Sequence, residues 1–148
     1  MWTNIDEELD LPFTFLGLPE PNDPESARLF VWPIPYESTT SYRSGTRSGP
    51  QAIIDASRYV ETYDEETGQE LADTPIVTLP GVAPILGAGD SMMSRIEQLA
   101  GEIIRPDRFI VSLGGEHSIS GPLVRAHAAV FGELTVVQID AHADLRPS

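Results

Sequence analysis

The sequence contains no cysteine and few basic residues. The absence of cysteine excludes disulfide bonds and metal sites with thiolate ligands. Lysine and arginine together number 9, against 23 aspartate and glutamate residues, so the formal charge at pH 7 is −14. A chain of this charge is repelled by nucleic-acid phosphates and by anionic membrane surfaces, and we expect it to bind neither.

Long apolar runs are also missing. No stretch reaches the length of a membrane-spanning helix. Residues 1–10 carry acidic but no basic side chains, unlike a secretory signal or a transit peptide. We therefore expect a cytoplasmic protein. The apolar content of 41% is sufficient for a buried core.

The first part of the chain differs in composition from the remainder. Residues 1–27 are acidic and contain Pro19, Pro21 and Pro24, which prevent regular structure there. We expect an extended acidic N-terminal arm over residues 1–27. Residues 28–148 carry the apolar periodicity of a folded domain.

Short apolar runs alternate with helical patterns in this second part. Strands are expected at 29–32, 76–79, 109–113 and 134–139. Helices are expected at about 49–59, 90–103 and 118–131, and residues 61–70 are expected to form a charged turn. Ile53, Ala56 and Val60 would make the inward face of the first helix. This alternation predicts an α/β sandwich with a parallel sheet.

Two motifs rich in metal-ligand side chains follow two of the expected strands. GGEHS occupies residues 114–118, after strand 109–113, and DAHAD occupies residues 140–144, after strand 134–139. The carboxyl ends of parallel strands gather at one edge of a sheet, where binding sites are built. Divalent cations of hard or borderline character prefer this mixture of carboxylate oxygen and imidazole nitrogen. We expect a metal site that uses His117, Asp140, His142 and Asp144.

The spacing within the second motif favours two ions. On an extended segment, side chains at i, i+2 and i+4 share one side and adjacent ones are about 7 Å apart. One small ion cannot reach all three unless the chain curls. Two ions bridged by Asp140 can, because paired hydrolytic metals lie about 3.5–4 Å apart.

Other polar residues admit less specific interpretations. Glu116 is expected to accept hydrogen bonds in its turn or to support a ligand, and not to be a ligand itself. His127 lies on the apolar stripe of its helix, which indicates a half-buried histidine satisfied by a neighbour. The polar loop 36–49 either shapes a pocket or forms a subunit contact or a solvated loop. Its large side chains are Tyr36, Tyr42, Arg43 and Arg47.

These motifs resemble those of the ureohydrolase family, which comprises arginases, agmatinases and their relatives. GGEHS is similar to the first metal motif of the family, and DAHAD is similar to the second. The segment 33–53 (PIPYESTTSYRSGTRSGPQAI) and Ala56-Ser57 are similar to agmatinases in particular. So is the Glu of GGEHS, where arginases usually have Asp. The resemblance extends from about Leu29 to Ser148.

The resemblance implies a fold and a chemistry. The fold would be an arginase-like three-layer α/β/α sandwich with a mostly parallel sheet, about half of which is present here. Two Mn²⁺ ions would be bound, one by His117 and Asp144, the other by His142, with Asp140 bridging. A metal-bridging hydroxide would attack a small cationic guanidino substrate, converting agmatine to putrescine and urea. The resemblance also implies a homo-oligomer, either a trimer or a hexamer.

The family's later ligand motif, Ser-x-Asp-x-Asp, does not occur in these residues. Residues 28–148 would therefore be the N-terminal portion of a single ureohydrolase domain, truncated after the second metal motif. We expect weak or no activity from this portion alone, and an apolar sheet edge exposed after strand 134–139.

Several alternatives remain open. A guanidinobutyrase, a formimidoylglutamase or an arginase would use the same metals on a different substrate tail. A truncated, non-catalytic form would keep metal binding and lose the chemistry. A deacetylase of related fold is disfavoured, because such sites bind a single ion and lack the GGEH segment.

Overall fold

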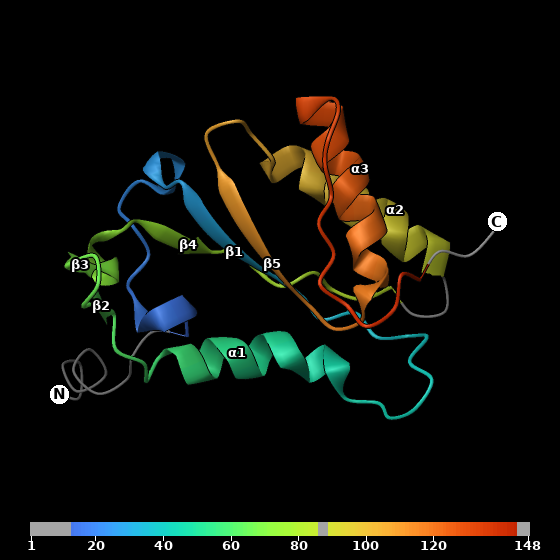
Figure 1. Cartoon of the computed structure of the whole chain (residues 1–148), viewed down its shortest axis with the longest axis horizontal. Helices are drawn as coiled ribbons and strands as arrows, with labels where there is room; N and C mark the ends of the chain where they lie inside the picture. Colours follow the sequence, from blue (N-terminus) through green and yellow to red (C-terminus); the bar gives the residue numbers. More distant parts are fainter. Residues whose placement is uncertain (1–12, 86–88, 145–148) are drawn as a thin grey trace, which may run out of the picture.

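The computed structural model describes residues 13–85 and 89–144. A parallel three-stranded sheet forms its centre, with strands β1 (Leu29–Ile34), β4 (Ile76–Thr78) and β5 (Phe109–Gly114). Three helices surround it: α1 (Gly49–Ser57), α2 (Gly89–Ile103) and α3 (Ser120–Phe131). Helix α1 covers one face of the sheet, and α2 and α3 pack together on the other (Figure 1). The predicted α/β sandwich with a parallel sheet is confirmed.

In the strand order β4-β1-β5, the direction in which strands are added reverses at β1, so a topological switch point lies between the carboxyl ends of β1 and β5. The chain passes from β1 through α1 to β4 on one side, then through α2 to β5 on the other side of β1. Leu29 lies opposite Phe109 and Ile34 opposite Gly114, so β1 and β5 end level with each other. The chain leaves these two strand ends in different directions, which is where open α/β sheets place their ligands.

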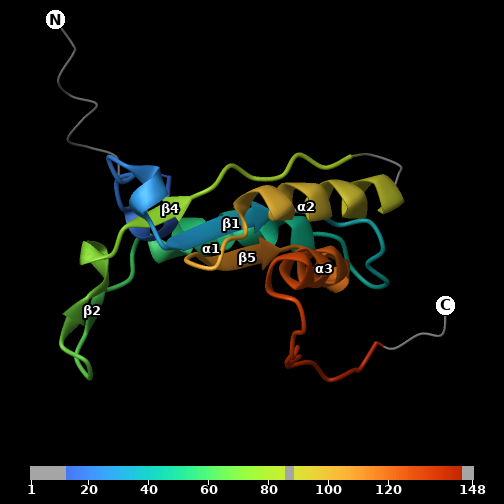
Figure 2. The same cartoon turned by 90° about the horizontal axis from the view of Figure 1, so that it is seen from above.

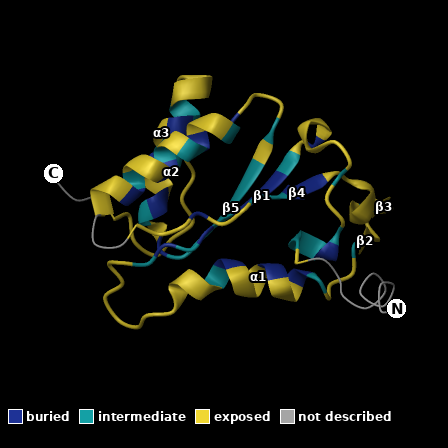
Figure 3. Ribbon diagram, turned by 180° about the vertical axis from the view of Figure 1, so that it is seen from behind, coloured by how far each residue is buried: buried dark blue, intermediate teal, exposed yellow. Residues whose placement is uncertain are grey.

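The core lies between β1 and the α2–α3 pair. Trp32 and Ile34 face α2, where Met92, Ile96 and Ala100 follow one another at intervals of four residues. Buried residues accordingly form the inner surfaces of the strands and helices, and exposed ones the outer surfaces (Figure 3). The four-residue spacing is that of a helix with one apolar stripe.

The buried face of α1 differs from the predicted one. Pro50, Ile54 and Ser57 are buried, whereas Ile53 is 46% exposed and Val60 lies beyond the helix. Burial of a serine requires partners for its hydroxyl. The Ser57 hydroxyl donates to the Ile54 carbonyl and accepts from the Leu16 N–H, a long-range contact that the local pattern does not reveal.

From residue 13 onward, the N-terminal segment packs against the domain and is held by hydrogen bonds and ion pairs. It contains two 3-10 turns, η1 (Phe15–Gly17) and η2 (Pro24–Ser26), where an extended chain is expected. The Phe15 N–H donates to the Thr78 hydroxyl at 2.9 Å, and Glu25 forms ion pairs beyond α2. Residues 1–12 of the expected arm lie outside the described residues, and the division at residue 27 stays a prediction.

Residues 61–70 form a small antiparallel hairpin where a turn was expected. Strand β2 (Tyr63–Asp64) pairs with β3 (Gln69–Glu70), and a 3-10 turn, η4 (Leu71–Asp73), follows. Gly68 adopts a φ of 66°, which suits the reversal. Two further 3-10 turns precede helices: η3 (Thr46–Ser48) before α1 and η5 (His117–Ile119) before α3.

The predicted strand at 134–139 is wrong. After α3 the chain turns at Gly132, and the following residues join no ladder. Val136, Val137 and Ile139 are 59%, 81% and 99% exposed. Their β-branched composition favours extended backbone, but a strand in a parallel sheet also needs neighbours and cover. In the described range, no strand pairs with this segment and no helix follows it.

None of the helices in the described ranges is both long and apolar enough to cross a membrane.

Candidate metal centre

A close contact between two backbone segments positions the GGEHS motif. After β5, the Gly115 N–H donates to the Ile34 carbonyl at 3.3 Å and the Glu116 N–H donates to the Tyr36 carbonyl at 2.9 Å. A Cβ atom added at Gly115 would overlap the backbone carbonyl of Tyr36. Glycine is therefore required for the chain after β5 to pass directly against the chain after β1. This close contact places His117 at the switch point between the carboxyl ends of β1 and β5.

Glu116 fixes this turn to the loop that follows β1. Its carboxylate accepts hydrogen bonds from the backbone N–H groups of Ser38 and Thr39, both at 2.7 Å, and from the hydroxyls of Thr39 and Ser118. Burial alone raises the pKa of Glu116, but these four hydrogen bonds outweigh it and lower the pKa to about 2. The prediction that Glu116 accepts hydrogen bonds in the turn is confirmed.

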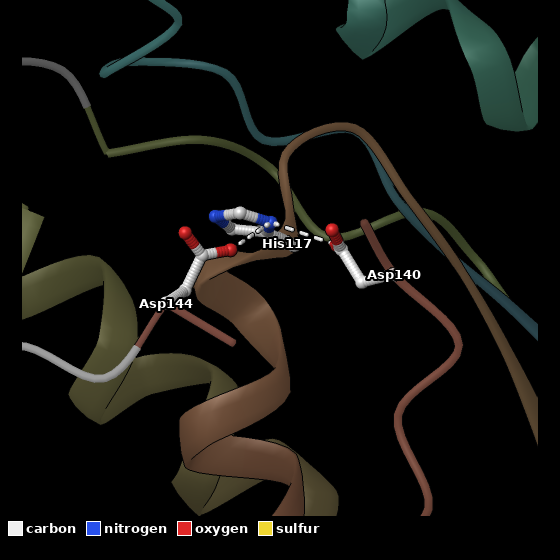
Figure 4. A group of neighbouring side chains, drawn as sticks. All are labelled: His117, Asp140 and Asp144. Carbon is white, nitrogen blue, oxygen red and sulfur yellow. Dashed lines mark ion pairs between the residues drawn. The ribbon is translucent and has the colours of Figure 1, made fainter. Parts of the chain in front are cut away.

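The structure brings three of the four predicted ligands together (Figure 4). Nδ1 of His117 lies 3.9 Å from Asp140 Oδ2 and 3.6 Å from Asp144 Oδ2. One potential ligand atom from each residue lies within 4.8 Å of the others. The side chains remain accessible, with 67%, 30% and 43% exposure for His117, Asp140 and Asp144.

The second motif curls and is not extended. The His142 N–H donates to the Asp140 carboxylate at 2.9 Å, and Asp144 adopts a φ of 50°, in the left-handed region. Asp140 and Asp144 consequently face the same imidazole. The hydrogen bond from His142 lowers the pKa of Asp140 below its usual range, with smaller contributions from the two imidazoles, while burial acts against them.

His142 lies beside the group but outside it. Its side chain is 80% exposed, and its Nδ1 atom lies 3.6 Å from Asp140 Oδ1. The DAHAD segment is curled, whereas the spacing argument assumed an extended one. It gathers one imidazole and two carboxylates around a common point and leaves His142 adjacent to Asp140. The arrangement of two ions bridged by Asp140 stays a prediction.

The geometry of this group fits a divalent cation. Two ligand atoms bound about 2.0–2.2 Å from one ion are at most about 4.4 Å apart. The two distances from His117 satisfy this limit, and all three ligand atoms lie within 4.8 Å of one another, so a small side-chain adjustment would place the set around one ion. One nitrogen and two carboxylate oxygens form a donor set that manganese, iron, zinc and nickel accept. His117, Asp140 and Asp144 are thus able to hold a cation, with His142 close enough to join after a side-chain rotation.

Cavities adjoin His117 on two sides. One, of about 410 Å³, lies under the loop after β1 and is lined by Thr39, Thr40, Ser41, Tyr42, Arg43, Thr46, Glu116 and His117. The other, of about 570 Å³, lies between the start of α3 and the segment 136–144. The imidazole of His117 forms part of the wall of the first cavity.

The loop after β1 therefore shapes a pocket, one of the alternatives that the sequence left open. Tyr42 and Arg43 line the cavity, whereas Tyr36 is 5% exposed and belongs to the core. Glu37 braces the loop by accepting from Gly45 and Arg47 N–H groups and from the Thr46 hydroxyl. Sequence reasoning missed this role of Glu37, since the sequence shows only a polar loop.

His127 is a structural histidine, as predicted. It is partly buried on α3, with Nδ1 2.8 Å from the Leu123 carbonyl. Its ring stacks on that of Phe131, with 6.2 Å between centroids.

The chain is thus an α/β protein with a candidate divalent-cation site, in which an imidazole just after β5 meets two carboxylates from the segment that follows α3. Residues 27–148 match the family model described as the Arginase family, and the chain belongs to that family. The predicted resemblance is confirmed.

The chain is also similar to individual ureohydrolases. The chain is 43% identical over 127 residues to an N(1)-aminopropylagmatine ureohydrolase of Synechocystis sp., covering 81% of this chain and 41% of that protein. It is 31% identical to an agmatinase of Bacillus cereus, covering 84% of this chain and 43% of that protein. The crystal structure of the agmatine ureohydrolase of Thermoplasma volcanium superimposes with a TM-score of 0.64 at 28% identity, covering 71% of this chain and 36% of that one. The chain spans about two fifths of the length of these curated relatives.

Proposed function

We propose that this chain carries part of the site for metal-dependent hydrolysis of a guanidino C–N bond, with agmatine converted to putrescine and urea. The convergence of His117, Asp140 and Asp144 on one point at the edge of the sheet carries the proposal. Membership of the arginase family and the names of the relatives support it. Manganese is the proposed metal.

Each part of the site has a distinct task. His117, Asp140 and Asp144 would hold the divalent cation, which would supply a nucleophile at neutral pH by lowering the pKa of a bound water. Glu116 keeps the turn before α3 in place through its four hydrogen bonds. The loop 39–46 forms the wall that orients the guanidino group next to His117. The net charge of −14 attracts a cationic substrate.

The substrate tail distinguishes the enzymatic alternatives. N(1)-aminopropylagmatine is a second candidate substrate, because the relative with that name is 43% identical, against 31% for the agmatinase. Both share the guanidino group on which the cation would act. Guanidinobutyrate, formimidoylglutamate and arginine are the other substrates that the resemblance allows.

A non-catalytic metal-binding form is a different kind of candidate. It is supported by the exposure of the three ligand side chains. Such a form would bind manganese without releasing urea. Homo-oligomerisation is proposed on the family resemblance alone, and a cytoplasmic location on the sequence composition alone.

Two measurements on the 148-residue chain test these proposals. Manganese binding is followed by the loss of the free Mn²⁺ signal in electron paramagnetic resonance. Urea release is assayed with agmatine, N(1)-aminopropylagmatine, arginine and guanidinobutyrate, with and without manganese. Binding with urea release supports the enzymatic role, and binding without it supports the metal-binding form. An unchanged free-Mn²⁺ signal contradicts both.

A further inference from the structure

Tyr42 presents an aromatic ring at the cavity beside His117, and an organic cation already lies over that ring. Tyr42 is 87% exposed, and the guanidinium carbon of Arg43 lies 5.2 Å from the centroid of its ring. This distance is within the range of a cation–π contact. Both residues line the same cavity of about 410 Å³ as His117. The wall of the cavity therefore includes an aromatic surface that binds a guanidinium.

Arg43 is held less firmly than other arginines of the chain. Ion pairs with carboxylates are formed by Arg58, Arg105, Arg108 and Arg125. Within residues 13–85 and 89–144, no carboxylate forms an ion pair with Arg43, and its cation–π contact is with the neighbouring Tyr42. Cation–π contacts at exposed sites are weak. The Arg43 guanidinium can therefore leave the ring at low cost and enter solvent.

The loop that carries these two side chains is held at both ends. Glu116 accepts hydrogen bonds from backbone N–H groups at its start, and Glu37 does so at its end. Residues 40–44 form the span between these anchors. Figure 2 shows the loop, drawn in cyan, extending beyond the end of β5. The two anchors keep Tyr42 at the cavity while the side chain of Arg43 changes rotamer.

The candidate substrates differ in the charge of their tails. Agmatine carries a guanidino group at one end of a short alkyl chain and an ammonium group at the other, whereas 4-guanidinobutyrate carries a carboxylate there. The cavity volume is typical of sites for small molecules, which span about 300–1,000 Å³. With the guanidino group next to His117, the tail lies against the loop wall. The face of an aromatic ring attracts a cation and not an anion.

We propose that the Tyr42 ring binds the ammonium tail of the substrate, which displaces the Arg43 guanidinium from the ring. This inference rests on the proposed function, hydrolysis of a guanidino C–N bond beside His117. Tyr42 is then a specificity-determining residue that favours substrates with a cationic tail. Arg43 is an internal competitor for the same aromatic surface.

Ligand titrations followed by nuclear magnetic resonance test the proposal on the 148-residue chain, without metal and without any assay of activity. The ring signals of Tyr42 and the Nε–H signal of Arg43 report on the two partners. Agmatine is expected to shift both sets of signals. It is expected to bind about two- to fivefold more tightly than 4-guanidinobutyrate, the factor that an exposed cation–π contact provides.

Variants of the pair separate the two roles. Tyr42→Leu is expected to abolish the preference for agmatine, and Tyr42→Phe, which keeps the ring, is expected to retain it. Arg43→Gln is expected to bind agmatine about two- to fivefold more tightly than the wild type, because the ring is vacated, with 4-guanidinobutyrate unaffected.

A second tyrosine–arginine pair provides the matched control. Tyr59 is 75% exposed and its ring centroid lies 5.9 Å from the guanidinium carbon of Arg58, but neither residue lines the cavity. Tyr59→Leu is therefore expected to bind agmatine as the wild type does.

Three outcomes would overturn the proposal. One is an agmatine affinity of Tyr42→Leu equal to that of the wild type. Another is a loss of 4-guanidinobutyrate affinity in Arg43→Gln with agmatine unaffected, which would assign Arg43 to an anionic tail. The third is the absence of binding by either ligand. Mn²⁺ binding and urea release are measured separately, so the proposed function can stand when this inference fails.

Discussion

Nδ1 of His117 lies 3.6 Å from a carboxylate oxygen of Asp144, although the whole of α3 separates them in the sequence. The histidine begins the 3-10 turn η5, α3 follows that turn, and the length of the helix returns the chain, so the two motifs meet. Asp140, between them, lies 3.9 Å from the same imidazole nitrogen. Because these three side chains meet, a substitution at Asp140 gives the most direct test of cation binding.

Asp140→Asn is expected to lower the Mn²⁺ affinity of the chain by about tenfold or more, because the change removes one of three charged or basic donors. Calorimetric titration measures the affinity. Asp107→Asn, an exposed aspartate outside the group, is the control and is expected to bind as the wild type does. Equal affinities for both variants would show that the cation is held elsewhere.

Gly115→Ala is expected to destabilise the fold by about 2 kcal/mol or more, because the new Cβ overlaps the Tyr36 carbonyl, which is rigid backbone. Thermal unfolding measures the effect. Gly101→Ala is the matched control. Nothing lies within 4 Å of a Cβ at Gly101, and alanine favours the helix there by about 0.5–1 kcal/mol, so this variant is expected to be slightly more stable. A melting temperature for Gly115→Ala equal to that of the wild type would contradict the close approach.

Glu116 is expected to make stability depend on acid pH. Its pKa is about 2 in the folded protein and 4.5 in the reference state, so the folded carboxylate holds its proton less tightly. The resulting stabilisation, of the order of 3 kcal/mol, is fully present above pH 4.5 and is lost as the pH falls toward about 2. Denaturant unfolding across this range measures it.

The matching variant, Glu116→Gln, cannot titrate and leaves donors of the turn poorly satisfied. It is expected to be less stable than the wild type at pH 7, with a difference that shrinks as the pH approaches 2. Glu97→Gln affects a surface ion pair with Arg125 and should change stability by less than about 1 kcal/mol. A constant difference between Glu116→Gln and wild type at all pH values would refute the hydrogen-bond account.

Two arginines that share one partner offer a further comparison. Arg108 and Arg105 both contact Glu25, at 2.6 Å and 3.1 Å, but the Arg108 side chain is 7% exposed and that of Arg105 is 52% exposed. Arg108 also lies over the Phe30 ring, 4.6 Å from its centroid. Arg108→Ala is expected to cost about 2 kcal/mol through lost packing and cation–π contact, and Arg105→Ala less than about 1 kcal/mol. Equal losses in chemical denaturation would argue against this difference.

The local pattern determined most of the fold. Apolar runs ending in proline or glycine located β1, β4 and β5 to within a residue or two, and the apolar stripe of Met92, Ile96, Leu99 and Ile103 located α2. These elements could be predicted because each buries a continuous stripe or face, which leaves a periodic trace in the chain. The metal motifs could be placed for the same reason, since each follows an apolar run.

Tertiary structure decided the rest. The inward face of α1 depends on the hydroxyl of Ser57 bonding to Leu16, and the role of Glu116 depends on donors in the loop after β1. Residues 134–139 carry the composition of a strand, but pairing requires a neighbour, and in this structure they have none among the described residues. The sequence by itself specified which side chains can bind a cation. Only the folded chain decided that His117, Asp140 and Asp144 meet while His142 stands beside them, because the curl of 140–144 is set by hydrogen bonds and backbone geometry and not by spacing alone.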